Sequence, residues 1–224
     1  MKPENQPTIK VALFPIPQMV SFPGSQVPLH VFEPRYRAMV KHCIETSMML
    51  AIAHTQKAKG PVKKTPKNIK TLNKNLTSYE PYSIFSAGTC ELLNTLDDGR
   101  MHINVKLKKR LQLIEIEQQV PFQIAYCQEL IDQENKASST QDIDKMQEIY
   151  TLLLAISETQ SPQLHEILKQ PSWEKLIPAQ FSFKIFDYFK FEADFMQYVL
   201  EQTSVSDRLE LIWQGLTQSL RRSP

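Results

Sequence analysis

The hydrophobic pattern of this chain changes its period between residues 131 and 139. Before that point, apolar residues form short runs or alternate with polar ones, which is typical of β-strands. From Ser139 onward, apolar residues recur every three or four positions, which is typical of helices that bury one face. The pattern therefore predicts an α+β protein whose first part is dominated by strands and whose second part is dominated by helices.

Turn signals divide the first part into short strands. Asp98-Gly99 predicts a hairpin, because both residue types tolerate positive φ. Apolar positions alternate from Met101 onward and slip in phase near residue 113, which predicts a bulge or a change of sheet face in a long strand. Gly88 is expected to bend the strand before the hairpin. The predicted strands lie within residues 8–14, 27–32, 48–53, 83–96, 101–116 and 122–126.

One amphipathic helix is predicted among these strands, over residues 34–46. Pro34 suits the first turn of a helix, where its missing N–H is not needed. Apolar residues then recur at helical spacing, and charged residues take the opposite face. The predicted apolar face consists of Tyr36, Met39, Val40, Cys43 and Ile44.

The helical part begins with Ser139 as the predicted N-cap. Three prolines divide the residues beyond the first helix into short helices, and the last two helices are expected at residues 190–202 and 206–221. Ser204-x-x-Asp207 is a predicted cap for the final one. The apolar stripe of the first helix consists of Ile143, Met146, Ile149, Tyr150, Leu153 and Ile156.

Charge changes this picture in one segment. The 224-residue chain is 42% hydrophobic and 22% charged, which is ordinary for a globular protein. Its net charge of +2 includes seven lysines between Thr46 and Tyr79, so subtracting seven leaves −5 for the remainder. Because residues 56–80 also lack periodicity, they are predicted to form a long, mobile, basic surface loop. The lysines are Lys57, Lys59, Lys63, Lys64, Lys67, Lys70 and Lys74.

Three features favour a cytoplasmic protein. The N-terminal residues, MKPENQPTIK, lack the apolar core of an export signal. No apolar run reaches the roughly 18 residues that a membrane span needs. Cys43, Cys90 and Cys127 are odd in number and widely spaced, which fits a reducing compartment better than a disulfide framework.

The motif search predicts no catalytic, cofactor or metal site. The five glycines form no phosphate-binding G-x-x-x-x-G-K-[ST] loop, and no C-x-x-C spacing suggests zinc. His42 and Cys43 are neighbours on a helix, so their side chains point about 100° apart. We interpret them as a solvated His beside a core Cys. An enzyme of unknown type stays an unsupported alternative.

Three blocks of residues together resemble one known family. They are residues 13–39 (LFPIPQMVSFPGSQVPLHVFEPRYRAM), the group Gly88-Thr89 with Asp98-Gly99-Arg100 and Arg110, and FMQYVLE (195–201) followed by SDRLE (206–210). In this order they resemble the substrate-recognition domain at the N-terminus of Lon-family ATP-dependent proteases. The blocks span most of the chain.

The resemblance implies a PUA-like, β-rich pseudo-barrel followed by a helical bundle. We expect the barrel over residues 8–131 and the bundle over residues 139–221. The resemblance further implies a stand-alone module that lacks the ATPase and the Ser-Lys protease of the family. Leu107 and Leu111 stand where members usually carry Gly and Phe. Leu107 implies ordinary strand geometry and puts a close backbone approach there in doubt.

The loop at residues 18–25 (QMVSFPGS) is the predicted contact with polypeptide. Met19, Val20 and Phe22 cannot all face inward from so short a segment bounded by proline. Exposed Met and Phe side chains make an adaptable apolar surface. Together with Pro23 they form the predicted binding residues, and the alternative that they fold under the barrel stays open.

Further members of the matched blocks are predicted to hold the fold together, because Arg–carboxylate pairs can join two elements. A direct role in ligand binding stays open for them. These motif residues are His30, Phe32, Glu33, Arg35, Tyr36, Gly88, Asp98, Gly99, Arg100 and Arg110.

The functional hypothesis is a non-catalytic recognition module that binds unfolded segments or a partner protein, such as a protease or chaperone. It would act as an adaptor or regulator of proteolysis. The alternative is a nucleic-acid or ribosome-associated protein that uses the lysine loop, since PUA-like barrels also serve RNA-binding proteins. That loop lacks the interleaved aromatic residues and arginines that single-strand binders use. No membrane partner is expected.

Overall fold

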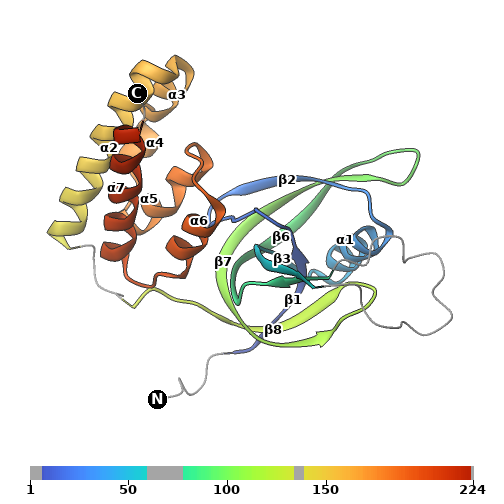
Figure 1. The fold of residues 1–224 in the computed structure, drawn as a ribbon. Helices are drawn as coiled ribbons and strands as arrows, with labels where there is room; N and C mark the ends of the chain where they lie inside the picture. Colours follow the sequence, from blue (N-terminus) through green and yellow to red (C-terminus); the bar gives the residue numbers. More distant parts are fainter. Residues whose placement is uncertain (1–6, 60–77, 134–138, 223–224) are drawn as a thin grey trace. The chain divides into compact units, whose positions relative to one another are not determined.

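The computed structural model describes residues 7–59, 78–133 and 139–222 of the chain (Figure 1). The chain divides between Leu130 and Ile131 into two compact units. The first, called here the barrel unit, is built mainly of strands, and the second, the helical unit, is built of helices. The predicted α+β class is therefore confirmed.

Five strands of the barrel unit close into a ring. The sheet order is β2-β7-β6-β3-β1-β8, and β8 also pairs with β7. The ring therefore runs from β7 through β6, β3, β1 and β8 back to β7, while β2 pairs with β7 as an additional strand. β1 and β3 are parallel, and the other pairs of this sheet are antiparallel. The strands are β1 (Ile9–Pro15), β2 (Gln26–Val31), β3 (Met49–Ala53), β6 (Ile84–Thr95), β7 (Met101–Gln118) and β8 (Gln123–Glu129).

Besides pairing with β6, β7 pairs with two further strands, one after the other along its length. Its first residues, from Met101 to Lys106, pair with β2, and Leu111 to Gln118 pair with β8. The register with β8 shifts between Leu113 and Glu115. Of the two alternatives predicted near residue 113, a bulge or a change of sheet face, the bulge is therefore confirmed.

Gly88 lies where the backbones of β6 and β7 approach each other closely. A Cβ atom on Gly88 would stand 1.8 Å from the carbonyl oxygen of Lys106 and 2.7 Å from the Cα of Leu107. The register between the two strands also shifts between Ala87 and Gly88. A close backbone approach beside Leu107 therefore exists, contrary to the doubt raised by that residue, because the glycine is supplied by the opposite strand.

Apolar side chains pack on both sides of the barrel strands. The helix α1 (Pro34–Thr46), predicted at these residues, buries Tyr36 and Met39 in the first of two core clusters. Along β1, Ala12 belongs to this first cluster, whereas Val11 and Leu13 belong to the second. β1 reads as a continuous apolar run because it is buried on both faces.

Two predicted core positions are exposed. Ile44 of α1 is 43% exposed, and Ile143 in the first helix of the helical unit is 42% exposed. Both lie at the margin of their apolar stripes, where a period of 3.6 residues turns a side chain away from the packed face.

The predicted loop over residues 56–80 is shorter than expected. Its two ends form β4 (Thr55–Lys59) and β5 (Ser78–Pro81), which pair as a separate antiparallel sheet. Backbone pairing overrode the polar, unpatterned sequence at these ends. The middle of the segment lies outside the described residues.

The helical unit consists of short helices between two longer ones. Proline stands in the first turn of α3, α4 and α5, as its fixed φ favours. Ser139 caps α2 in a reciprocal capping box with Asp142, so the predicted N-cap is confirmed. No described helix is long and apolar enough to cross a membrane. The helices are α2 (Thr140–Gln160), α3 (Pro162–Leu168), α4 (Pro171–Glu174), α5 (Pro178–Lys184), η1 (Ile185–Asp187), α6 (Ala193–Glu201) and α7 (Val205–Arg222).

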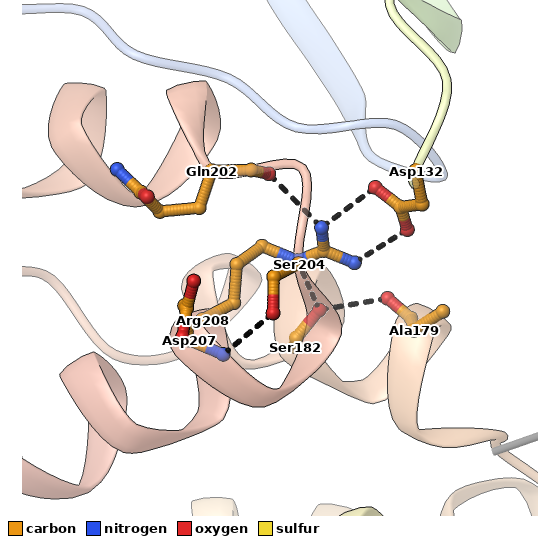
Figure 2. A network of polar contacts seen from close by, with 7 residues as sticks. All are labelled: Asp132, Ala179, Ser182, Gln202, Ser204, Asp207 and Arg208. Atoms are coloured by element: carbon orange, nitrogen blue, oxygen red, sulfur yellow. Dashed lines mark hydrogen bonds and ion pairs between the residues drawn. The ribbon is translucent and has the colours of Figure 1, made fainter. Parts of the chain in front are cut away.

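Arg208 of α7 is the largest fully buried side chain of the described chain, with 0% exposure. Its Nη1 and Nη2 donate to the two carboxylate oxygens of Asp132, each at 2.7 Å (Figure 2). Nη1 also donates to the carbonyl oxygen of Gln202 at 3.0 Å, and Nε donates to Ser182 Oγ at 3.0 Å. The guanidinium lies over the Phe183 ring, 4.4 Å from its centroid. Residues on α5, on α7 and just after the barrel unit are thereby joined within the helical unit.

Candidate polypeptide-binding surface

The predicted contact loop, residues 18–25, is tied to the barrel unit. Phe22 is only 2% exposed, so the expectation of a surface Phe at this position is wrong. Met19 is partly buried against the first core cluster, and Val20 and Pro23 are half-buried. Prolines did not keep these side chains at the surface, because Met19 packs against the first core cluster and hydrogen bonds join Ser21 to β6 and Gly24 to β7. The binding role predicted for the four residues stays a prediction.

Hydrogen bonds hold this loop in place. The backbone N–H of Gln18, whose φ is 58°, donates to Nδ1 of His54 at 3.1 Å. Ser86 Oγ donates to the carbonyl oxygen of Ser21 at 2.6 Å. The N–H of Gly24 donates to the carbonyl oxygen of Leu107 at 3.0 Å. A segment anchored at both ends and in the middle gives a rigid framework rather than an adaptable surface.

The start of α1 is joined to the β6–β7 hairpin. Arg35 Nε pairs with Glu33 Oε2 at 2.8 Å, and its guanidinium lies 4.5 Å from the centre of the Tyr36 ring. Arg37 Nη1 donates to the carbonyl oxygen of Asp98 at 3.1 Å. The geometry agrees with a scaffold role for these motif residues.

Within the hairpin, Arg100 holds the Asp98 carboxylate. The backbone N–H of Arg100 donates to Oδ1 at 3.1 Å, and its Nε donates to Oδ2 at 2.6 Å. The bond from the Arg100 N–H, followed by the pairing with its guanidinium, lowers the pKa of Asp98. Gly99 has a φ of 81°, and a Cβ there would stand 2.4 Å from Arg37 Nη1. The positive φ favours glycine at this turn, whereas the end of the flexible Arg37 side chain can move away from an added Cβ.

The motif residues form two separate groups. Arg37, Asp98 and Arg100 meet at the hairpin, whereas Gly88 lies in the middle of β6. Arg110 is 4% exposed and stands ten positions after Arg100 along β7. Ten residues of strand span about 33 Å, so the structure does not bring these two arginines together.

Exposed apolar side chains gather by register at the hairpin end of strands β2, β7 and β6. Phe32, which follows β2 directly, is 60% exposed. Leu92 and Leu93 of β6 are 42% and 58% exposed, and the ladder shifts register just after Leu92, which leaves Leu93 without a partner. His102 of β7 lies between them in the sheet order, and the ring of its partner His30 in β2 stands 4.8 Å from the His102 ring and 6.2 Å from Phe32. Leu92 pairs with the buried Ile103, so it faces the other side of the sheet, whereas the shift places Leu93 beside Asn94, opposite His102. We call Phe32, His30, His102 and Leu93 the hairpin-end surface.

Two local signals could have pointed to this surface. Val31 is buried, and the next residue of an extended strand faces the opposite side, which places Phe32 outward. Two adjacent leucines at positions 92 and 93 also break the alternation of β6. Sequence reasoning placed Phe32 among the scaffold residues and did not single out the leucines.

Only two of the seven lysines of the predicted basic loop lie among the described residues. Lys57 and Lys59 lie in β4, while the remaining five predicted contact lysines lie outside the described residues. Two other lysines of the barrel unit, Lys106 and Lys109, pair with Glu91 and Glu129. The polyanion contact therefore stays a prediction.

The cysteines have the wrong protonation for nucleophiles. Burial raises the pKa of Cys43 and Cys127 to about 12 and that of Cys90 to about 11. A thiol with so high a pKa is almost entirely protonated at neutral pH. His42 beside Cys43 is half-buried, with its Nε2 atom buried and its ring 5.6 Å from Phe122, so the expectation of a solvated His is wrong.

A Ser–His contact occurs in the helical unit. Ser157 Oγ stands 3.0 Å from Nδ1 of His165 and donates to the carbonyl oxygen of Leu154 at 2.9 Å. Ser157 is fully buried, so a substrate cannot reach its hydroxyl. We interpret the pair as a structural link between α2 and α3. The described residues contain no group of three side chains able to hold a metal ion.

Comparison with known proteins identifies the relatives of this fold. The family model described as the ATP-dependent protease La (LON) substrate-binding domain matches residues 10–218. The solved N-terminal domain of a Mycobacterium avium complex Lon protease is 15% identical, with a TM-score of 0.66 over 93% of this chain and 98% of that one. A Lon N-terminal domain protein from Xanthomonas campestris is also 15% identical, with a TM-score of 0.58 over 96% and 99%. Among curated protein sequences, none matches.

Proposed function

Because this chain belongs to the family of the ATP-dependent protease La (LON) substrate-binding domain, we propose that it binds polypeptide and catalyses no reaction itself. The ligand is an unfolded segment or an exposed part of a partner protein. Its apolar side chains would replace water on the surface of the barrel unit.

The observation that carries this proposal is the hairpin-end surface. Phe32 is 60% exposed and its ring stands 6.2 Å from His30, and Leu93 is 58% exposed in the bulge of β6 opposite His102. Arg37 and Asp98 join the hairpin to α1, so the underlying backbone is held before a ligand arrives. Binding by a preorganised apolar surface avoids much of the entropic cost of ordering a loop.

A titration with a permanently unfolded polypeptide tests the proposal. Reduced, carboxymethylated α-lactalbumin carrying a fluorophore would be titrated with the full chain by anisotropy, at low and high salt. We expect saturable binding that persists at high salt, because apolar contacts are not screened. Phe32→Ser should weaken it roughly fivefold to tenfold, as expected for losing one large apolar contact.

Val120→Ser is the matched control. Val120 is 53% exposed in the β7–β8 turn of the same unit, so the substitution removes apolar area away from the hairpin end. It should leave the affinity unchanged. Equal losses for both variants, or binding only to a single-stranded RNA with steep salt dependence, would contradict the proposal.

An adaptor or regulatory role in proteolysis is the finer form of this proposal. If the chain presents bound segments, it should change the rate at which an ATP-dependent protease degrades the same unfolded polypeptide. Phe32→Ser should remove that change in rate, and an effect that survives the substitution would separate regulation from polypeptide binding.

A further inference from the structure

β2 has one partner strand and one open edge. Within the described part of the chain it pairs with β7 alone (Figure 1). The N–H of Leu107 donates to the carbonyl oxygen of Ser25 at 3.0 Å, so the polar backbone groups of Ser25 point toward β7. The register continues from Gln26 to Val31 without a shift. Because these groups alternate in direction along a strand, those of Val27, Leu29 and Val31 point to β7 and those of Gln26, Pro28 and His30 point away.

The outward-pointing groups of β2 are not used elsewhere in the described chain. No hydrogen bond joins the backbone of Gln26, Pro28 or His30 to another described residue on that side. All three residues are exposed. An extended backbone is the natural partner for such a row of donors and acceptors.

Pro28 limits how this edge can pair. Its missing N–H belongs to the outward side, so the proline costs the β2–β7 ladder nothing. A strand that adds along the edge receives only a carbonyl at Pro28, while His30 offers both an N–H and a carbonyl. Gln26 also offers both groups, but only His30 lies next to the exposed Phe32, so we place the pairing at His30.

From this arrangement we propose that the polypeptide binds as an added β-strand on the open edge of β2, paired with the backbone of His30 and with an apolar side chain against Phe32. The inference rests on the proposed function and adds the binding mode. The occupant is an extended segment that has no proline at the paired positions. Because main-chain bonds supply much of the affinity, many sequences can bind, as a recognition module for unfolded chains requires.

His30→Pro tests the edge directly. Proline removes the outward N–H and leaves the inward bonds of Leu29 and Val31 intact. His30→Ala is the matched control, because it removes the same imidazole and keeps the N–H. We expect roughly a tenfold loss of affinity for carboxymethylated α-lactalbumin with His30→Pro, and less than about a threefold loss with His30→Ala.

A modified ligand gives a second test that leaves the protein untouched. The probe is a fluorescent heptapeptide that alternates valine with threonine and has a central phenylalanine. N-methylation of one set of alternate residues should abolish binding, and N-methylation of the other set should change it less than about twofold, because only one set faces β2. Equal effects of both sets would overturn the proposal.

Hydrogen exchange locates the added strand. The amide of His30 should exchange fast in the free protein and become protected by the heptapeptide, while Leu29 and Val31 are protected in both states. Polypeptide binding without protection of His30 would overturn the edge inference and leave the proposed function standing. Loss of all polypeptide binding would instead remove the proposed function. A dimer abolished by His30→Pro, with no heptapeptide binding, would assign the edge to a second copy of the chain and overturn the inference.

Discussion

The Arg208 guanidinium shows what one residue does in this molecule. A fully buried charge is tolerated only when its hydrogen bonds are satisfied and a counter-charge is close. Asp132 supplies the counter-charge, and Ser182 and the Gln202 carbonyl accept further bonds (Figure 2). Breaking this group should therefore cost more than breaking any exposed ion pair of the same unit.

Asp132→Asn is predicted to destabilise the helical unit by about 3 kcal/mol, because Arg208 is left buried without its counter-charge. Both tryptophans, Trp173 and Trp213, lie in this unit, so tryptophan fluorescence during urea unfolding measures its stability alone. Glu166→Gln is the control, since the Lys169–Glu166 pair has side chains 55% and 73% exposed. The control should change stability by less than about 0.5 kcal/mol, and similar losses for both variants would refute the prediction.

Gly88→Ala is predicted to destabilise the barrel unit by more than about 3 kcal/mol, because the new methyl group would overlap the backbone of β7. Gly24→Ala is the comparison, since Gly24 has a φ of 89° but open space around its Cα. It should cost only about 1 kcal/mol, through backbone conformation alone. Hydrogen-exchange mass spectrometry of peptides from β6 and β7 measures both, and a milder effect at Gly88 would show that the strands can separate there.

The three thiols are predicted to resist alkylation in the folded protein. Burial raises their pKa values to between about 11 and about 12, so the thiolate is scarce at pH 8. For each thiol the pKa in the folded protein exceeds that in the unfolded chain, so the unfolded chain loses its thiol protons first as the pH rises. The contribution of the protonated thiols to the free energy of unfolding is therefore complete below pH 9 and is lost as the pH rises toward 12. Iodoacetamide labelling followed by mass spectrometry checks this, with urea-unfolded protein as the positive control. Rapid labelling of Cys43 or Cys127 at pH 8 would be inconsistent with their burial.

At the scale of the element, local chemistry accounts for most boundaries. The helix over residues 34–46, the Asp98-Gly99 hairpin and the Ser139 cap were predicted, because each depends on contacts within a few residues. β4 and β5 were missed, because their pairing joins Lys57 to Glu80 across a polar segment with no strand pattern. A strand that is specified by its partner leaves no periodic signal of its own.

The N-cap of α2 is predicted to stabilise the helical unit. Ser139 Oγ accepts a bond from the Asp142 N–H at 3.1 Å, and the Asp142 side chain also accepts from Ser206 Oγ at 2.6 Å. Ser139→Ala should cost the helical unit about 1 kcal/mol by removing the cap. Ser139→Asp should restore most of that loss, because a carboxylate also caps a helix N-terminus. Urea unfolding followed by fluorescence separates the two, and an unchanged Ser139→Ala variant would show that Asp142 alone holds the helix start.

At the scale of the whole molecule, the boundary between the two units defines the residue at which a stable fragment of the helical unit can begin. The predicted helical segment starts at residue 139, but Asp132 is bonded to Arg208 and the Gln133 N–H donates to the carbonyl oxygen of Thr203 at 3.0 Å. We predict that a fragment of residues 131–224 unfolds cooperatively and that a fragment starting at 139 loses about 3 kcal/mol or more of stability, the cost of leaving Arg208 unpaired. Equal stability of both fragments by urea unfolding would mean that Asp132 is dispensable.

The amino-acid sequence by itself determined the family, the order of strands and helices apart from β4 and β5, the irregularity in β7 and the caps. These depend on periodicity and turn chemistry, which act over a few residues. Only the tertiary structure decided that Phe22 is buried, that Arg208 is buried with Asp132, and which side of β2 is open. Each of these depends on which distant segments meet, and a side chain's own sequence neighbourhood carries no record of what covers it.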